Sequence, residues 1–231
     1  MFKENPFSKY DFVASLSKKK KPAKQRGALD LAGFWAIYEH ANVPTQIAML
    51  ISLTTTMRRD DIVRLRLDEN VQDGQLQATL TKSLNQRGAA AAAHLSWELN
   101  EHKDLKKAVD LGRERSLRYH RCPYIVSKRR VRKDVQRSTR LQHNSQCLPE
   151  YISRQFRKAR DKTVLWEGDD HPPSFHEIRG LAITLLLRQG IDIAAVQRLA
   201  AHTDAATTSA YTANQSPDYV NMGGMVVGVQ R

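Results

Sequence analysis

The chain has few of the features that mark secreted, metal-binding or membrane proteins. Its 231 residues include only two cysteines, Cys122 and Cys147, too few for a disulfide framework and too far apart for a CxxC metal pair. No apolar run is long enough to cross a membrane, and no signal peptide is recognisable. No cluster of aspartates and glutamates has metal-ligand spacing. We therefore expect a cytoplasmic protein without a metal or other cofactor.

Acidic residues are also scarce beside basic ones. The chain has 37 lysines and arginines against 24 aspartates and glutamates, which gives a formal net charge of +13. Such an excess favours a polyanionic partner, and nucleic acid is the first candidate. The length is sufficient for one sizeable hydrophobic core. These properties predict a basic globular protein that binds nucleic acid and associates with the nucleoid.

Two basic stretches are candidates for contact with a nucleic-acid backbone. Residues 1–28 are predicted to form a linker or arm, because the run "KKKKPAKQR" is charged, broken by proline and without apolar periodicity. The second stretch, "SKRRVRKDVQRSTR", is expected to be an exposed loop. Their lysines and arginines can neutralise phosphates. The candidate DNA-binding residues are Lys18, Lys19, Lys20, Lys21, Arg129 and Arg130.

The rest of the chain alternates between helical and strand patterns. Apolar spacing predicts helices from Leu29, from Pro44, over Ile62 to Leu65, over 98–112, over about 149–162 and through the C-terminal third. Asp73-Gly74 is a hairpin turn signal. The alternation of Leu76, Ala78 and Leu80 predicts a strand, and "AAAAAHL" is interpreted as its returning partner. The fold class is therefore α+β, mainly helical, with one small antiparallel sheet.

The stretch "SFHEIRGLAITLLL" joins a chemical pattern to a buried helix. Ser174 and Glu177 have the spacing of a capping box, which places His176 and Arg179 in the first turn and on one face. Free N–H groups and the positive end of the helix dipole favour an anion there, and arginine can bind a phosphate through two parallel hydrogen bonds. A histidine and a surface arginine at a helix start are common, so the pattern alone does not identify a site.

The segment after this helix makes the pattern specific. Gly190 is a helix stop and Asp192 is the expected N-cap of a further helix, and His202 and Tyr211 come next, nine residues apart. This order of features resembles the C-terminal signature of the tyrosine recombinases, the phage-integrase family. The signature consists of H-x-x-R, a buried helix, "GIDI", "AHT" and the tyrosine. Upstream, the family has an arginine that is followed three residues later by a glutamate or aspartate. In "TTMRRDDIVRL", the spacing to Asp61 favours Arg58 as this arginine over its neighbour Arg59.

The resemblance extends to a lysine, and the sequence departs from the family pattern at two positions. The family's hairpin lysine corresponds to Lys82 in "TKS", whereas Thr56 and Ala201 stand where the family usually has glycine.

The resemblance covers roughly residues 29–215, which it implies form a tyrosine-recombinase catalytic domain. Residues 216–231 are then a C-terminal tail, whose segment 225–229 is expected to add a strand to a sheet edge, in its own subunit or a neighbour. A core-binding domain normally precedes the catalytic one in this family, so we expect either a catalytic fragment or a naturally short protein.

The resemblance implies an activity and a role for each matched residue. The family cleaves and rejoins DNA at specific sites through a 3′-phosphotyrosine, here in phage or genomic-island integration and excision. Tyr211 is the implied nucleophile, and Arg58 and Arg179 clamp the phosphate. His176 is the implied general base, His202 binds the phosphate or shares the proton transfer, and Lys82 is the implied general acid. The implied partners are double-stranded DNA, further copies in a tetramer and DNA-bending accessory proteins. The alternatives are a non-catalytic DNA-binding regulator and a type IB topoisomerase-like enzyme.

Overall fold

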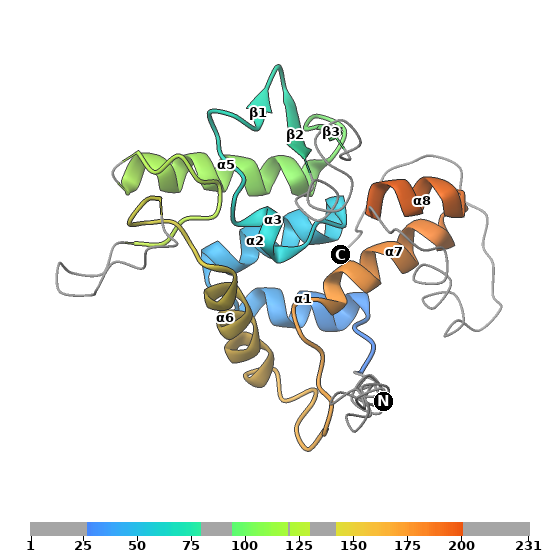
Figure 1. Cartoon of the computed structure of the whole chain (residues 1–231). Coiled ribbons are helices and arrows are strands. Elements are labelled where there is room, and N and C mark those ends of the chain that lie inside the picture. Colours follow the sequence, from blue (N-terminus) through green and yellow to red (C-terminus); the bar gives the residue numbers. More distant parts are fainter. Residues whose placement is uncertain (1–26, 80–93, 120, 130–141, 201–231) are drawn as a thin grey trace, which may run out of the picture.

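The computed structural model describes residues 27–79, 94–119, 121–129 and 142–200 (Figure 1). These residues include both the helices and the small sheet of the predicted class. The elements in chain order are α1 (Leu31–His40), α2 (Val43–Thr55), α3 (Arg59–Ile62), β1 (Val71–Gln72), β2 (Gln75–Thr79), β3 (His94–Glu98), α5 (Lys103–Arg118), α6 (Pro149–Asp161), α7 (Glu177–Arg188) and α8 (Ile193–Ala200).

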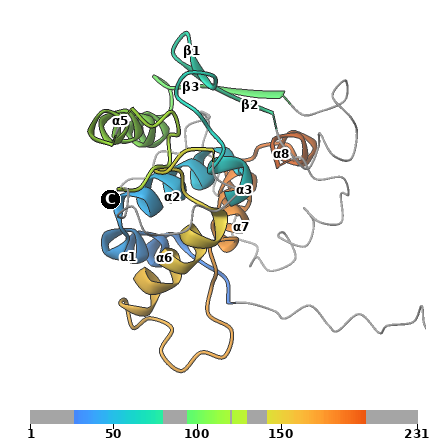
Figure 2. The same ribbon diagram turned by 60° about the vertical axis from the view of Figure 1, so that its left-hand side comes forward.

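Helix α2 is the centre of the core. Its residues from Ile47 to Ile51 are fully buried, which is typical of a helix that is apolar on every side. It packs against α1, α3, α5, α6 and α7. Figures 1 and 2 show α2 running through the middle of the molecule, with α5 on one side and α1 on the other. The ends of α2 are therefore held firmly, and its C-terminal end leads directly to Arg58.

Side-chain caps explain where the first two helices begin. The Asp30 carboxylate accepts a hydrogen bond from the backbone N–H of Gly33 at 2.7 Å, and Asn42 accepts one from Thr45 at 3.2 Å. Pro44 lies in the first turn of α2, where its missing N–H costs nothing. Both predicted helices are present. The predicted helix at 149–162 is also present, as α6.

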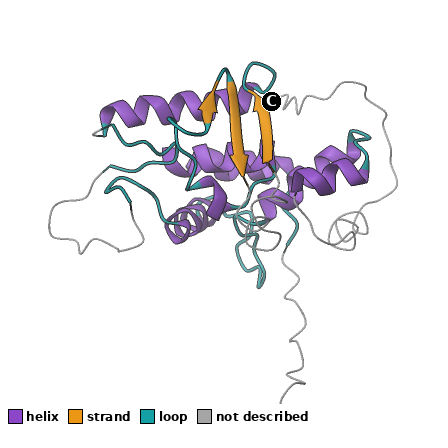
Figure 3. Cartoon of the chain, turned by 45° about the horizontal axis from the view of Figure 1, so that its top comes forward, coloured by secondary structure: helices purple, strands orange, loops and turns teal. Residues whose placement is uncertain are grey.

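The sheet has the predicted hairpin. Its strand order is β1-β2-β3, and both pairs are antiparallel. Asp73 and Gly74 have φ angles of 50° and 78°, as a two-residue turn between right-twisted strands requires. Leu76 lies opposite Trp97, and both are buried in the core. Figure 3 shows the three strands side by side. The predicted return strand is confirmed over 94–98, whereas Leu80 and residues 89–93 lie outside the described part of the chain.

Two predicted helices have different limits in the structure. Helix α3 has only four residues, and the chain after it makes a turn in which Leu65 N donates to Ile62 O at 3.2 Å. There Leu65 accepts a hydrogen bond from Ile125 N at 3.0 Å, so its side chain is buried beside a neighbouring segment and not on a helix. The helix expected from residue 98 begins at Lys103, because Glu98 pairs with Gln75 in the sheet.

Both cysteines are free and buried. Burial raises the pKa of the Cys147 thiol to about 12 and also raises that of Cys122. Among the described helices, none has the length and apolarity needed to cross a bilayer. The described residues also contain no cluster of three or more histidines, cysteines or acidic residues with the geometry of a metal site.

Candidate active site

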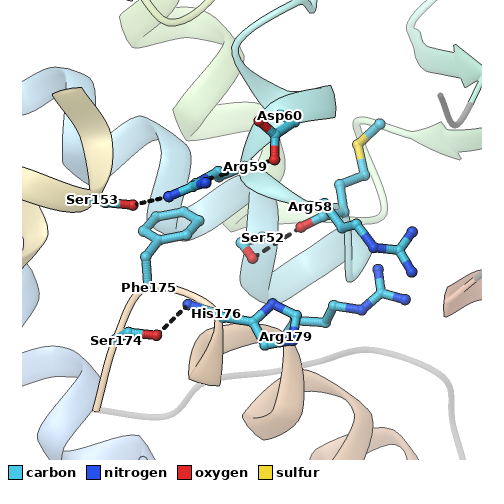
Figure 4. A pocket seen from close by; sticks show the side chains of 10 residues that line it. Ser52, Arg58, Arg59, Asp60, Ser153, Ser174, Phe175, His176 and Arg179 are labelled. Carbon is cyan, nitrogen blue, oxygen red and sulfur yellow. Dashed lines mark hydrogen bonds and ion pairs between the residues drawn. The ribbon is translucent and has the colours of Figure 1, made fainter. Parts of the chain in front are cut away.

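Three of the predicted site residues lie around one cavity. Arg58, His176 and Arg179 come from the end of the α2–α3 turn and the start of α7, and they surround a space of about 440 Å³ (Figure 4). Helix α6 closes the cavity on another side. The full lining consists of Ser52, Met57, Arg58, Arg59, Asp60, Ser153, Ser174, Phe175, His176 and Arg179.

Arg58 lines this cavity, and one of its hydrogen-bond donors is unused among the described residues. It is the N-cap residue of α3, with extended backbone angles. Its Nη1 atom is buried and has no hydrogen-bond partner among the described residues. A buried donor without an acceptor is destabilising, by about 1–3 kcal/mol or more for a charged group. An anion that accepted a hydrogen bond from this atom would remove that penalty, so the geometry favours an anionic ligand beside Arg58.

Arg179 is almost completely buried, with an exposed fraction of 2%. Its Nη1 donates to the carbonyl oxygen of Thr56 at 2.5 Å, and its Nη2 donates to the carbonyl oxygen of Ala200. One guanidinium therefore ties the first turn of α7 to the ends of α2 and α8. Arg179 lines the cavity, and its contacts also fix the walls around it.

Thr56 adds a second link between the same two ends. Its hydroxyl donates to the carbonyl oxygen of Leu199 at 3.3 Å, and its side chain is fully buried. Its φ and ψ angles, 57° and 12°, place it in the left-handed region, where a β-branched residue is strained. This is the position at which the family usually has glycine. Here the contacts of Thr56 hold the strained turn that leads to Arg58.

The predicted capping box at Ser174 is not the start of the helix. Helix α7 begins at Glu177 with His176 as its N-cap residue, whose side chain makes no capping hydrogen bond. The two residues of the predicted box do meet, since the Ser174 hydroxyl donates to Glu177 Oε2 at 3.2 Å. Ser174 instead begins a tight turn, in which Glu177 N donates to Ser174 O at 3.1 Å and Arg179 N donates to His176 O at 3.1 Å. The turn is held by buried Phe175, whose ring packs edge-to-face on Phe156 of α6 at 5.7 Å. This packing directs His176 and Arg179 to the same cavity.

Arg58 and Arg59 point in different directions. In Figure 4 the side chains of Arg58 and Arg179 extend to the same side, whereas Arg59 extends toward Ser153. Arg59 Nη1 donates to the Ser153 hydroxyl at 2.5 Å, and its Nε lies 3.7 Å from the Asp60 carboxylate. The geometry thus pairs Arg58, and not its neighbour, with Arg179.

The other predicted site residues lie mostly outside the described chain. Strand β2 ends at Thr79, shortly before Lys82, and α8 ends at Ala200, shortly before His202. Arg129 is described and exposed. The predicted residues outside the described ranges are Lys18, Lys19, Lys20, Lys21, Lys82, Arg130, His202 and Tyr211, and the tail segment 225–229 is outside them as well.

Comparison with known sequences identifies relatives over most of the chain. The model of the phage integrase family matches residues 30–217. The chain is 28% identical over 203 residues to the prophage integrase IntE of Escherichia coli K12, with 86% of this chain and 49% of that protein covered. It is 24% identical over 212 residues to the integrase of Enterobacteria phage P21, with 90% and 51% covered. The chain therefore spans about half the length of these curated relatives.

Solved structures share the fold. A lambda integrase dimer bound to a COC′ core site superposes with a TM-score of 0.67 at 20% identity, covering 93% of this chain and 69% of that one. The lambda integrase catalytic core gives 0.57 at 23% identity, covering 78% and 94%. The XerA recombinase gives 0.58 at 17% identity, covering 84% and 61%. The predicted α+β fold, mainly helical with a small antiparallel sheet, is confirmed. With a family model that matches residues 30–217, the chain belongs to the phage integrase family.

Proposed function

We propose that this chain contains the catalytic domain of a site-specific DNA recombinase, over residues 29–215, and serves integration or excision of a phage or genomic island. The observation that carries the proposal is that Arg58 lines the same cavity as Arg179 and that its buried Nη1 has no hydrogen-bond partner among the described residues. Two arginines from distant parts of the chain, one with an unused donor, form a suitable site for a phosphodiester. The relatives with 28% and 24% identity are both named integrases.

In the proposed reaction, the phenolic oxygen of Tyr211 attacks a DNA phosphorus. A bond from that oxygen to phosphorus forms, and the bond from phosphorus to the 5′ oxygen breaks. His176 takes the proton of Tyr211, and Lys82 protonates the departing 5′ oxygen. His202 donates a hydrogen bond to the phosphate. The 3′-phosphotyrosine retains a phosphodiester linkage, so a DNA 5′ hydroxyl can reverse the reaction and rejoin the strand.

Arg58 and Arg179 are proposed to stabilise the transition state. Extra negative charge develops on the non-bridging oxygens as the phenolate approaches, and fixed guanidinium groups in a partly buried cavity interact strongly with it. Arg179 is already held in place by Thr56 and Ala200, so little reorganisation is required. Two guanidinium groups supply the positive charge that a divalent metal provides in other phosphoryl-transfer enzymes, and we propose a reaction that uses none.

The proposed partners are double-stranded DNA and further copies of the chain. The lambda integrase dimer on a core site and a lambda integrase tetramer bound to a Holliday junction have the same fold, with TM-scores of 0.67 and 0.65. We propose a tetramer on DNA, assisted by DNA-bending proteins and located at the nucleoid in the cytoplasm. The basic arm of residues 1–28, Arg129 and Arg130 would contact the DNA backbone.

The proposal is tested by trapping the covalent intermediate. The protein is incubated with a nicked duplex that carries the attachment junction of its genetic element, and the products are separated on a denaturing gel. We expect a protein–DNA adduct, reduced about 100-fold or more by Arg58→Ala. Arg118→Ala is the matched control, because Arg118 is exposed on α5 and pairs with Glu114 of the same helix. Salt-dependent DNA binding without any adduct would instead identify a non-catalytic regulator.

A further inference from the structure

The cavity contains a third arginine, which the proposed reaction does not use. Arg59 lines the same space as Arg58 and Arg179, but its guanidinium lies toward α6. Its side chain is 38% exposed, so it faces both the cavity and solvent. Figure 4 shows the two ends of the lining, with Arg58 and Arg179 at one end and Arg59 with Ser153 at the other. Positive charge is thus placed at two separate points.

The size of the cavity fits more than one anionic group. Its volume is about 440 Å³, whereas a water molecule in the liquid takes about 30 Å³. A single phosphate between Arg58 and Arg179 would leave most of that space unfilled. A DNA strand carries one phosphate per nucleotide, so a second negative charge always follows the first along the strand.

Ser153 gives Arg59 a fixed position. Ser153 lies on α6 next to Ile152, which is fully buried, and three residues before Phe156, which is nearly so. The Ser153 hydroxyl accepts from Arg59 Nη1 at 2.5 Å. A guanidinium has five N–H donors in a rigid plane, and the contact with Ser153 uses one of its terminal nitrogens. The group is oriented by this contact while most of its donors are left for another acceptor.

Asp60 partly offsets the charge of Arg59. Its carboxylate lies 3.7 Å from Arg59 Nε, and its side chain is 56% exposed. An ion pair this long and this exposed contributes little stability, so a phosphate can replace it. Asp60 therefore competes with an anion for the same guanidinium and weakens its binding.

From this arrangement we propose that Arg59, positioned by Ser153, binds a second phosphate of the cleaved strand, next to the phosphate held by Arg58 and Arg179. The inference rests on the proposed function, since it needs a DNA strand in the cavity. It assigns Arg59 a binding role beyond the six residues matched to the family. The competing explanation is that Arg59 and Ser153 only join α3 to α6.

The test uses two short ligands that differ by one phosphate. A thymidine dinucleotide has one phosphodiester, and a thymidine trinucleotide has two. Binding of each to the full chain is measured by NMR titration at low salt. Two equivalent phosphates favour the trinucleotide by a factor of about two on statistical grounds alone. We expect the trinucleotide to bind several-fold more tightly than this factor allows, and we call that additional preference the excess. In Arg59→Gln, which keeps a donor for Ser153 but loses the charge, the excess should disappear while dinucleotide binding stays the same.

Three further variants separate binding from a structural link. Arg118→Gln removes an exposed charge outside the cavity and should leave the excess unchanged. Ser153→Ala should reduce it, because the guanidinium loses its fixed position. Asp60→Asn should increase it, because the competing carboxylate is gone.

The possible results distinguish the two proposals. Equal binding of the two ligands by the unchanged protein, or an excess that persists in Arg59→Gln, would overturn the second phosphate site and leave the proposed function intact. If neither ligand bound, and Arg58→Gln made no difference to duplex DNA binding, the proposed function would fail and this inference with it.

Discussion

The guanidinium of Arg179 donates a hydrogen bond to the backbone carbonyl of Thr56, which lies 123 positions earlier in the chain. A second nitrogen of the same group donates to Ala200 at the end of α8. The Thr56 hydroxyl in turn donates to Leu199. These contacts join the turn before Arg58, the start of α7 and the end of α8. The residue proposed to hold the phosphate therefore also holds its surroundings together.

Arg179→Lys should impair both stability and the reaction although it keeps the positive charge. A lysine ammonium is a point charge and cannot reach two carbonyl groups in the fixed geometry of a guanidinium. We expect a loss of about 2 kcal/mol in the free energy of unfolding, measured by urea denaturation. Adduct formation should fall by about 100-fold or more. Arg188→Lys, at the exposed end of α7, is the control. Near-normal cleavage by Arg179→Lys would show that Arg179 does not bind the phosphate.

Substitutions of Thr56 should separate backbone strain from the contact of its hydroxyl. Thr56→Gly relieves a left-handed conformation that costs about 1–2 kcal/mol but loses the hydrogen bond to Leu199, so its stability should stay within about 1 kcal/mol of the unchanged protein. Thr56→Val keeps the strain and loses the hydroxyl, and it should be less stable by about 2 kcal/mol. Thermal unfolding measures both. Equal stability of the two variants would contradict the role assigned to the strain.

Much of the fold is decided by signals close together in the sequence. Asp30 and Asn42 each cap a helix within three residues of themselves, and Asp73-Gly74 forms the turn it predicts. His176 and Arg179 reach one cavity because they are three residues apart at the start of a helix. Local hydrogen bonds and backbone preferences decide such features, so a single sequence contains the necessary information.

Other features depend on contacts that no local pattern contains. Arg59 turns toward Ser153, 94 positions away, and Arg179 is buried because carbonyls of two distant helices surround it. Ser174 has the spacing of a cap, but the buried contact of Phe175 with Phe156 favours a tight turn before the helix. In each case, tertiary packing outweighed the local preference.

Tyr211→Phe should abolish the covalent adduct and change DNA binding by no more than a few-fold. The substitution removes only the phenolic oxygen, which is the proposed nucleophile. Adduct formation is measured on a denaturing gel, and DNA binding by fluorescence anisotropy. Tyr119→Phe is a matched control, because Tyr119 stacks with Arg115 at the end of α5, away from the cavity. A linkage to DNA that resists denaturant in Tyr211→Phe would mean that another residue is the nucleophile.

Adduct formation should continue in excess chelator. Arg58 and Arg179 are proposed to supply the charge stabilisation that a divalent ion would otherwise provide. The rate of adduct formation is compared with EDTA and with added magnesium, after exhaustive dialysis. We expect the two rates to agree within a few-fold. Activity that is lost in EDTA and restored by magnesium would require a different mechanism.

Alkaline pH should destabilise the protein partly through Cys147. Burial raises the pKa of this thiol to about 12, from an ordinary value of 9.0. Above pH 9 the unfolded chain releases the thiol proton while the folded chain keeps it, so deprotonation favours unfolding. The contribution of the thiol is fully present below pH 9 and is lost as the pH rises toward 12, by at most about 1.4 kcal/mol per pH unit. We expect urea denaturation at pH 8 and pH 10.5 to show a larger loss of stability in the unchanged protein than in Cys147→Ala. The same loss in both would place the alkaline sensitivity in other groups.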